Sequence, residues 1–332
     1  MKGIGGMTKL LKEYGSIVLI FVAVLILRFI LPRPFIMDVL IFGVYAMAFN
    51  FLMGHLGLVS FGQPAYLGLG AYGTALYLSY VGTNPYVGIL AGVLVGIVVS
   101  MLVGVFLVRL SSSYFTLANL AFCAIVFFLF QKGLVSITRG DTGLWYLARM
   151  TKGALLDLKN PNDLFIFVFA VAVLVWVFFR YIDTTVYGAC CLAGKVNEPK
   201  LQFLGYNTFR IKWLGFVIAN AVAALAGSLY AIYFGFVSPG LTELTRAAEV
   251  VIVGLLGGVG TLLGPLVGAF VYIGMKDLIS KFIMYWELVV GLLLVLVMLA
   301  GERGIVGTLG PLVNRLMRRR APGLAGAEGR KP

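Results

Sequence analysis

The pattern closest to a known reactive motif is the stretch at residues 68–73, which reads Gly-Leu-Gly-Ala-Tyr-Gly. Glycines at this spacing form the fingerprint of dinucleotide-binding folds, in which they let the backbone approach a pyrophosphate. That fingerprint also requires a preceding strand and an acidic residue about 20 positions later. Here the stretch lies within an apolar run, and the next acidic residue is Asp141. A dinucleotide site is therefore excluded at these residues.

Other reactive groups are few. The only Gly-Lys pair, at residues 194–195, is followed by Val196 and lacks the spaced glycine of a Walker A loop, so this chain is not expected to hydrolyse ATP by itself. The chain has one histidine, His55, and three cysteines, two of them adjacent. This set favours neither a metal site nor a disulfide framework. We therefore expect no catalytic residue, no cofactor and no metal site in this chain.

The elements that carry these residues are apolar enough to lie in a membrane. The chain has 332 residues, of which 61% are hydrophobic and only 12% are charged, whereas a soluble domain has roughly a quarter of its residues charged. Since a helix needs about 20 apolar residues to cross a bilayer, the sequence predicts an all-α, polytopic membrane helix bundle of about ten spans. The expected spans are 15–31, 35–53, 62–80, 86–108, 114–131, 163–180, 213–236, 247–260, 261–281 and 282–300.

The net charge of +13 does not indicate a nucleic-acid partner, because the basic residues lie in the loops and the tail. Basic loops mark the cytoplasmic side of a membrane protein. This rule places the basic tail in the cytoplasm, and counting spans backward places the loop at residues 181–212 and the N-terminus there as well. The same count places residues 132–162 outside, although that loop carries five basic residues. We expect a transmembrane domain at residues 1–300 of the plasma (inner) membrane, followed by a basic cytoplasmic tail at 301–332 that is partly disordered.

Small residues recur every four positions in two of the expected spans, which predicts close packing between helices. They are Gly88, Gly92, Gly96, Ser100 and Gly104 in one span, and Ala219, Ala223, Gly227, Ala231 and Gly235 in the other.

Glycine and proline interrupt the helical pattern at residues 54–64 and again at 254–265. Broken helices at membrane depth occur where the backbone is buried in protein or lines a cavity, and paired breaks in the two halves of a chain indicate a transport path. Ordinary tight turns between spans are the alternative interpretation. The candidate residues of the translocation path are Ser60, Gln63, Tyr66, Tyr72, Gly257, Gly258 and Gly260.

Charged residues within the expected spans are few and fall mostly toward the span ends, where their side chains can reach the interface at modest cost. They include Arg28, Asp38, Glu249, Lys276, Asp277 and Glu287. Transport driven by a proton or sodium gradient usually needs ionisable or coordinating groups near the middle of the membrane. An energy source outside this chain is therefore expected.

The order of the motifs resembles the membrane permeases of branched-chain amino acid ABC importers, in particular the M-type Liv subunit. The resemblance covers roughly residues 36–300. Its matching segments are 54–72, 114–122, 138–144, 197–207, 226–239 and 254–268.

The resemblance implies a permease subunit that moves branched-chain or related amino acids across the membrane by alternating access. It implies four partner proteins besides membrane lipid: a second homologous permease, two cytoplasmic ATPase subunits and a soluble substrate-binding protein. It also implies that the loop at 188–206, which has the pattern of a short helix ending at Gly205, docks on the ATPase. The residues assigned to this coupling loop are Lys195, Asn197, Glu198 and Gly205.

The sequence departs from the family pattern at three places. Gln63-Pro64 stand where relatives commonly carry His-Ala, Pro199-Lys200 interrupt an alanine-rich stretch, and Lys195 stands where arginine is common. Three alternatives stay open from the residues: an ABC permease for urea or short amides, a stand-alone secondary transporter, and a passive channel for a small neutral solute such as urea. By pattern alone the loop at 188–212 favours a surface connector over a docking site.

Overall fold

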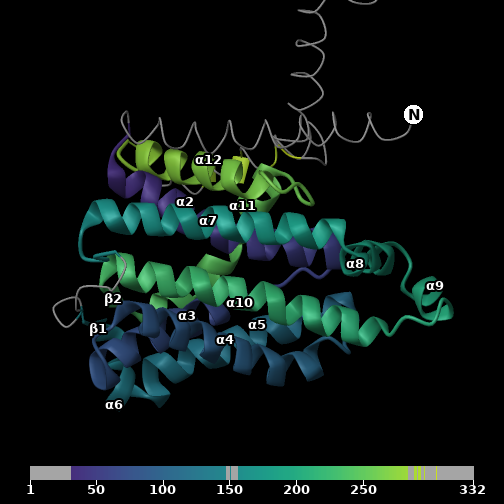
Figure 1. Cartoon of the computed structure of the whole chain (residues 1–332), viewed down its shortest axis with the longest axis horizontal. Helices are drawn as coiled ribbons and strands as arrows, with labels where there is room; N and C mark the ends of the chain where they lie inside the picture. Colours follow the sequence, from purple (N-terminus) through teal and green to yellow (C-terminus); the bar gives the residue numbers. More distant parts are fainter. Residues whose placement is uncertain are drawn as a thin grey trace, which may run out of the picture.

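The computed structural model of the chain describes residues 31–146, 150, 156–282, 288–289, 291–292, 295 and 304. This part is a bundle of helices lying side by side, and α8 and α9 lie at the opposite end from a small β-ribbon (Figure 1). The first half contains α2 (Arg33–Phe51), η1 (Leu52–Leu56), α3 (Gln63–Leu76), η2 (Tyr77–Val81), α4 (Pro85–Leu107), α5 (Ser112–Phe128), η3 (Leu129–Gly133), α6 (Val135–Thr138), η4 (Gly140–Thr142) and β1 (Leu144–Trp145). The second half contains α7 (Pro161–Thr184), α8 (Val186–Val196), α9 (Glu198–Phe203), α10 (Thr208–Phe234), β2 (Phe236–Val237), η6 (Pro239–Thr242), α11 (Leu244–Gly257) and α12 (Gly264–Ile279).

Five helices in the described part are long and apolar enough to cross a membrane, and they coincide with five of the expected spans. They are Arg33–Leu56, Pro85–Leu107, Ser113–Gly133, Pro161–Thr184 and Thr208–Phe234. Three other expected spans correspond to the shorter helices α3, α11 and α12. Helix α11 has 14 residues, or about 21 Å at 1.5 Å per residue, which is less than the roughly 30 Å thickness of the hydrocarbon core. The expected span at 15–31 and most of the one at 282–300, like the tail, fall outside the described residues.

Asparagine side chains fix where four of the helices begin. In each case the side chain of an asparagine accepts a hydrogen bond from a backbone N–H in the first turn, which is the usual N-terminal cap. The caps are Asn84 of α4, Asn160 of α7, Asn197 of α9 and Asn207 of α10. Because of its cap, α10 begins at Thr208 rather than at 213, and its polar first turn lies outside the apolar pattern from which the span was predicted.

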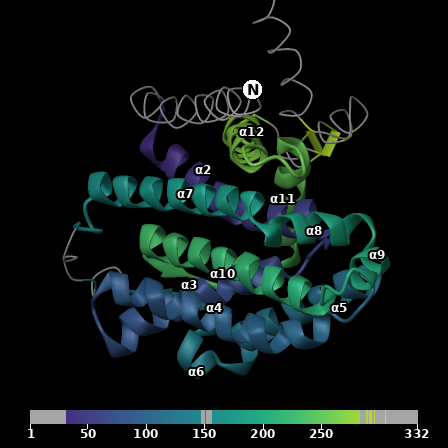
Figure 2. The same cartoon turned by 45° about the vertical axis from the view of Figure 1, so that its right-hand side comes forward.

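Helices α2 and α10 form the centre of the bundle. In their most apolar stretches 83% and 78% of the residues are buried, against 28% in α4 and α5 and 39% in α7. Helix α10 packs on α2, α3 and α4, with α11 and α12 on one side of the bundle and α3 to α5 on the other (Figure 2). The outer helices leave large apolar side chains exposed, such as Leu94, Leu102 and Phe106 of α4. These faces suit contact with lipid.

Small residues let α3, α4 and α10 approach closely. A Cβ atom added to Gly92 of α4 would lie 2.3 Å from the carbonyl oxygen of Gly70, and one added to Gly227 of α10 would lie 1.9 Å from that of Leu67. Gly70 itself belongs to the stretch that resembles the dinucleotide fingerprint, and its added Cβ would lie 2.0 Å from the carbonyl oxygen of Ala224. The glycines of that stretch therefore lie in helix α3. Gly70, at least, allows α3 to pack closely on α10.

One feature was not expected from the sequence, namely a ribbon of two short antiparallel strands. Leu144 pairs with Val237 and Trp145 with Phe236. The adjacent Tyr146 is buried, and its hydroxyl donates a hydrogen bond to the carbonyl oxygen of Ala231 at 2.7 Å. The ribbon therefore ties the loop after α5 to the end of α10.

Candidate functional site

The first glycine-rich break begins where α2 ends. Helix α2 widens into the π-helical turn η1, and the chain then reverses at Gly57, whose φ of 69° is in the left-handed region that favours glycine. An irregular stretch follows before α3 begins at Gln63. Single π-helical turns within helices occur frequently at functional sites.

The second break separates α11 from α12, and a side chain from α2 holds it in place. Gly258 and Gly260 have φ angles of 111° and 80°, so both need glycine. The side-chain amide of Asn50 donates to the carbonyl oxygen of Thr261 and accepts from the N–H of Gly260, both at 2.9 Å. A protein side chain thus provides hydrogen-bond partners for two backbone groups of this break. Irregular backbone at membrane depth needs such partners.

The two breaks touch each other. A Cβ atom added to Gly54 would lie 2.8 Å from the Cα of Gly260 and 2.9 Å from its nitrogen. Within the second break, one added to Gly257 would lie 1.9 Å from the carbonyl oxygen of Gly264. The structure therefore brings the two predicted interruptions together at one backbone-to-backbone contact.

The four polar residues predicted on the first stretch share an unusual environment. Ser60, Gln63, Tyr66 and Tyr72 are at most 1% exposed, and each has a side-chain oxygen or nitrogen without a hydrogen-bond partner. Buried polar atoms normally have a partner, and an exception needs a reason such as bound water or function. Together these residues give α3 and the stretch before it a set of buried polar groups that could bind water or a polar solute if the helices separated.

Two asparagines that the sequence analysis missed extend this set. Asn119 of α5 and Asn220 of α10 are fully buried, and each has at least one polar side-chain atom without a partner. A Cβ atom added to Gly62 would lie 2.6 Å from the carbonyl oxygen of Asn119. An amide within an apolar run is the signal that could have identified both.

Not every predicted residue lies at the meeting point of the breaks. Tyr72 instead packs on the ring of Phe130, which belongs to the π-helical turn η3 at the end of α5.

The predicted coupling segment, residues 188–206, consists of the two helices α8 and α9, not one helix ending at Gly205 as predicted. Asn197 is extended, with φ of −154°, and separates α8 from α9, which it also caps. Gly205 lies beyond the end of α9 with φ of 85°. Glu198 forms an ion pair with Lys212 at the start of α10. The single long helix fails because the Asn-Glu-Pro sequence starts a new helix, with proline in its first turn.

Lys195 links this coupling segment to the first break. Its Nζ atom donates a hydrogen bond to the carbonyl oxygen of Gly54 at 2.9 Å. A Cβ atom added to Gly57 would lie 3.0 Å from the lysine stem. A residue predicted for the ATPase interface therefore contacts the segment predicted for the path.

A second link joins the same turn to the end of α7. The Nε2 atom of His55 lies 2.7 Å from Oδ1 of Asp183, and the histidine is buried. Thr185, two residues later, caps α8. The sequence analysis did not identify this pair, although a single histidine within a glycine-rich break is a recognisable signal.

Cys191 lies on α8, within the coupling segment, and its thiol is buried. Burial raises its pKa to about 11, and this outweighs a side-chain hydrogen bond with Tyr187 that lowers it. Tyr187 also donates to the carbonyl oxygen of Ile211 at 2.8 Å. Helix α8 is therefore packed firmly onto the start of α10.

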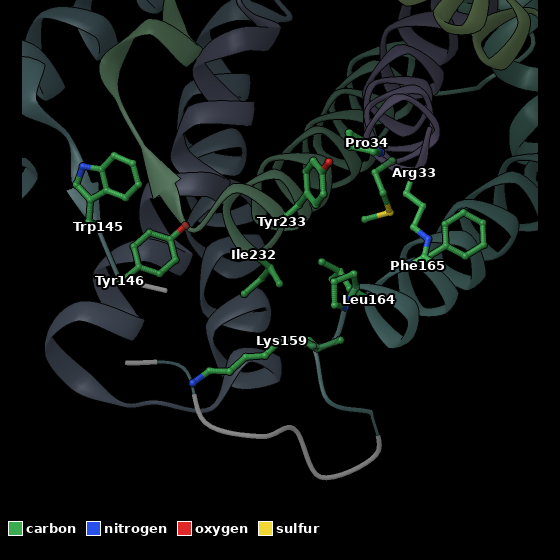
Figure 3. Close-up of a pocket in the computed structure, with 12 residues that line it drawn as sticks. Arg33, Pro34, Trp145, Tyr146, Lys159, Leu164, Phe165, Ile232 and Tyr233 are labelled. Carbon is green, nitrogen blue, oxygen red and sulfur yellow. The ribbon is translucent and has the colours of Figure 1, made fainter. Parts of the chain in front are cut away.

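A large pocket of about 890 Å³ lies at the other end of the bundle, between the ends of α2, α7 and α10. Figure 3 shows aromatic side chains on its walls, with Trp145 and Tyr146 on one side and Phe165 on the other. Arg33 and Lys159 add two positive charges to its lining. This pocket lies at the β-ribbon end, away from the coupling segment.

Three relatives show what the chain is similar to. The LivM permease protein of the high-affinity branched-chain amino acid transport system of Escherichia coli K12 is 27% identical over 289 residues, covering 80% of this chain and 68% of that protein. The LivH permease protein of that bacterium's high-affinity branched-chain amino acid transport system is 27% identical over 197 residues, covering 54% and 60%. A probable LivM permease of Methanocaldococcus jannaschii is 24% identical over 284 residues, covering 74% and 81%. No solved structure matches the chain.

The family match covers both breaks and the coupling segment. Residues 34–298 match the family described as the permease component of branched-chain amino acid transport systems. This agrees with the resemblance found in the sequence motifs and with the helices that can cross a membrane. The chain belongs to this family of branched-chain amino acid transport permeases.

Proposed function

We propose that this ABC permease subunit imports branched-chain or related amino acids across the inner membrane by alternating access, together with a second, homologous permease. The similarity to both LivM and LivH supports such a pair. Two cytoplasmic ATPase subunits hydrolyse ATP, so this chain has no catalysis of its own. A soluble binding protein delivers the amino acid from outside.

The proposed topology has ten spans with both termini in the cytoplasm. The basic tail supports this orientation. It places α8 and α9 on the cytoplasmic side, where an ATPase can reach them, and it places the β-ribbon and the large pocket outside, where a binding protein would dock. In this orientation α11 runs inward from the outer end, and the second break lies near the cytoplasmic end of α2.

The proposed mechanism connects ATP hydrolysis to the path through the two breaks. The ATPase docks on the coupling segment and moves α8, which moves the first break at Gly54 and, through it, the second break at Gly260. The helices around α3 then separate, and Ser60, Gln63, Tyr66 and Tyr72 gain water or amino acid as hydrogen-bond partners. Glu198, Asn197 and Gly205 shape the docking surface.

The observation that carries this proposal is the hydrogen bond from Lys195 to the carbonyl oxygen of Gly54. It is a direct contact between the coupling segment and a break. A hydrogen bond from a charged donor contributes about 1.5–3 kcal/mol when buried, and less here because Lys195 is an exposed residue. A contribution of about 1 kcal/mol corresponds to roughly a fivefold shift between two conformations.

The test is leucine uptake per ATP hydrolysed in liposomes that contain the complete importer. Lys195→Met should lower this ratio several-fold while the complex still assembles and hydrolyses ATP. Lys195→Arg should keep the ratio, since arginine can donate to the same carbonyl oxygen. Lys200→Met is the matched control, because it removes the same charge from an exposed position on α9. Equal ratios for Lys195→Met and Lys200→Met would contradict the mechanism, and a wild-type importer without ATP-driven leucine uptake would contradict the proposed function.

A further inference from the structure

A second, smaller cavity of about 160 Å³ lies between α2, α10, α11 and α12. Its lining combines charged residues with aromatic and aliphatic ones. The charged members are Asp38, Arg246, Glu249, Lys276 and Asp277. The sequence analysis treated four of these as separate residues near span ends, whereas the fold brings them to one place.

The charges of this cavity are arranged by sign. Nη1 of Arg246 lies 2.8 Å from Oε2 of Glu249, and Nζ of Lys276 lies 3.8 Å from Oε1 of the same glutamate. Glu249 is thus the shared counter-ion of the two cations. Asp38 and Asp277 line the same cavity as the two cations, and the charges of Asp277, Lys276 and Arg246 all act on the Asp38 carboxyl. The described residues provide no ion pair for either of these aspartates within 4.0 Å.

This arrangement leaves binding capacity for both signs of charge. A guanidinium has five N–H donors, and the contact with Glu249 uses one nitrogen of Arg246. Arginine also suits planar, bidentate recognition of a carboxylate. The two aspartates of this cavity repel each other, and a cation between them would relieve that repulsion.

Apolar groups complete the lining of the cavity. Ile41 of α2 and Ile273 of α12 are both buried and both line it. The ring of Phe42 stacks on that of Tyr272, with centroids 6.0 Å apart and planes 14° apart. A ligand that suits this lining carries one positive charge, one negative charge and an apolar side chain.

We propose that this cavity binds a zwitterionic α-amino acid with an apolar side chain, its carboxylate on Arg246 and its ammonium group between Asp38 and Asp277. This inference rests on the proposed function and names the residues that would recognise its cargo. One water needs roughly 10–15 Å³ of such space, so 160 Å³ holds a molecule of about ten heavy atoms, the size of leucine. The cavity lies near the start of α2 and of α11, at the end proposed to face outside.

The test measures binding to the purified permease–ATPase complex in lipid nanodiscs, without the binding protein. The probes are leucine, 3-methylbutylamine, which lacks the carboxylate, and 4-methylpentanoate, which lacks the amino group. Arg246→Gln should weaken leucine and 4-methylpentanoate about tenfold or more, the loss expected for a charge-assisted hydrogen bond, and leave 3-methylbutylamine unchanged. Asp38→Asn should weaken leucine and 3-methylbutylamine and leave 4-methylpentanoate unchanged.

Two control variants separate recognition from packing. Glu243→Gln removes a charge at an exposed position just before α11 and should change no affinity. Glu249→Gln breaks the ion pairs without removing a proposed ligand group, so it tests whether the cluster is only structural. If Glu249→Gln and Arg246→Gln lower thermal stability alike and neither discriminates among the probes, the cluster is structural and the proposal is wrong.

The proposal and the proposed function can fail separately. The complete importer may be assayed for ATP-driven leucine uptake in parallel with the binding measurements. The cavity is not the amino-acid site if the wild type shows uptake but binds no leucine at millimolar concentrations. The same conclusion follows if the wild type shows uptake and every variant gives the same probe pattern. Absence of ATP-driven uptake by the wild type instead overturns the proposed function.

Discussion

The hydrogen bonds of Asn50 allow a quantitative test of how the second break is held. Replacing Asn50 by alanine removes one donor and one acceptor and leaves the carbonyl oxygen of Thr261 and the N–H of Gly260 without their partner. Asn50 itself is only 4% exposed. An unpaired buried backbone group costs about 1–3 kcal/mol.

The lower end of this range applies here, because Gly260 is exposed and Thr261 half-buried, so water can replace part of what is lost. Two groups at about 1 kcal/mol each give a loss of about 2 kcal/mol. For a chain of this size, that loss lowers the melting temperature by about 4 °C. Helices α11 and α12 should then lose their fixed geometry, and ATP-driven uptake should fall with it.

Three buried cysteines, Cys123, Cys190 and Cys191, provide the assay. A thiol-reactive fluorophore added during a thermal scan reacts as unfolding exposes them. Asn220→Ala is the matched control, since Asn220 is equally buried but neither of its polar side-chain atoms has a partner. Equal melting temperatures for Asn50→Ala and Asn220→Ala would refute the reasoning, because removing the satisfied amide would then be no worse than removing the unsatisfied one.

Three further predictions concern the contact between the breaks, the coupling segment and the topology. Gly54→Ala should cost about 1–3 kcal/mol by overpacking, whereas Gly274→Ala, whose Cβ meets only atoms at 3.7 Å or more, should be tolerated; equal melting temperatures would rule out the contact. Because burial raises the pKa of Cys191 to about 11, its thiol stays protonated at neutral pH. Alkylation of Cys191, measured by mass spectrometry, should therefore rise only as the pH approaches 11. Rapid alkylation of the folded protein at pH 7 would contradict this. In intact cells an impermeant thiol reagent should label a cysteine placed at Asp141 but not one at Asn197, and the reverse result would invert the topology.

The apolar runs predicted the helix positions well, but not their ends. The expected span at 163–180 is the helix Pro161–Thr184, which continues for four residues past the apolar run to Thr184. That extension includes Asp183, whose carboxylate binds His55. A polar last turn stabilised by a distant side chain leaves no trace in local hydropathy, so the predicted cytoplasmic loop at residues 181–212 begins too early.

The positions of the two breaks could be predicted, but their contact could not. Glycine and proline identify where a helix is interrupted, because these residues act on the local backbone. The contact between Gly54 and Gly260 depends on how α2 packs on α11 and α12, which joins positions about 200 residues apart. A polar residue within an apolar run, Asn50, was the available signal, and it lay outside the predicted set.

The charged cavity was missed for a related reason. Each of its residues lies near a helix end, where a single helix offers an easy route to the interface. Judged one at a time, Asp38 and Asp277 therefore indicate snorkelling. Only the packing of α12 against α2 brings both into the lining of one cavity, and that juxtaposition turns two ordinary interfacial residues into a candidate cation site.

Helix α2 connects the two proposed sites within one rigid element. It carries Asp38 at the charged cavity and Asn50 at the second break, twelve residues or about 18 Å apart at 1.5 Å per residue. Close-packed helices shift between discrete arrangements rather than deform continuously. Under the proposed function, a displacement of the turn at Gly54 by α8 therefore moves both ends of α2, so release of the amino acid from the outer cavity and opening of the inner break belong to one conformational step. A crosslink that fixes α2 to α12 should accordingly abolish uptake even though it touches neither the coupling segment nor the ATPase.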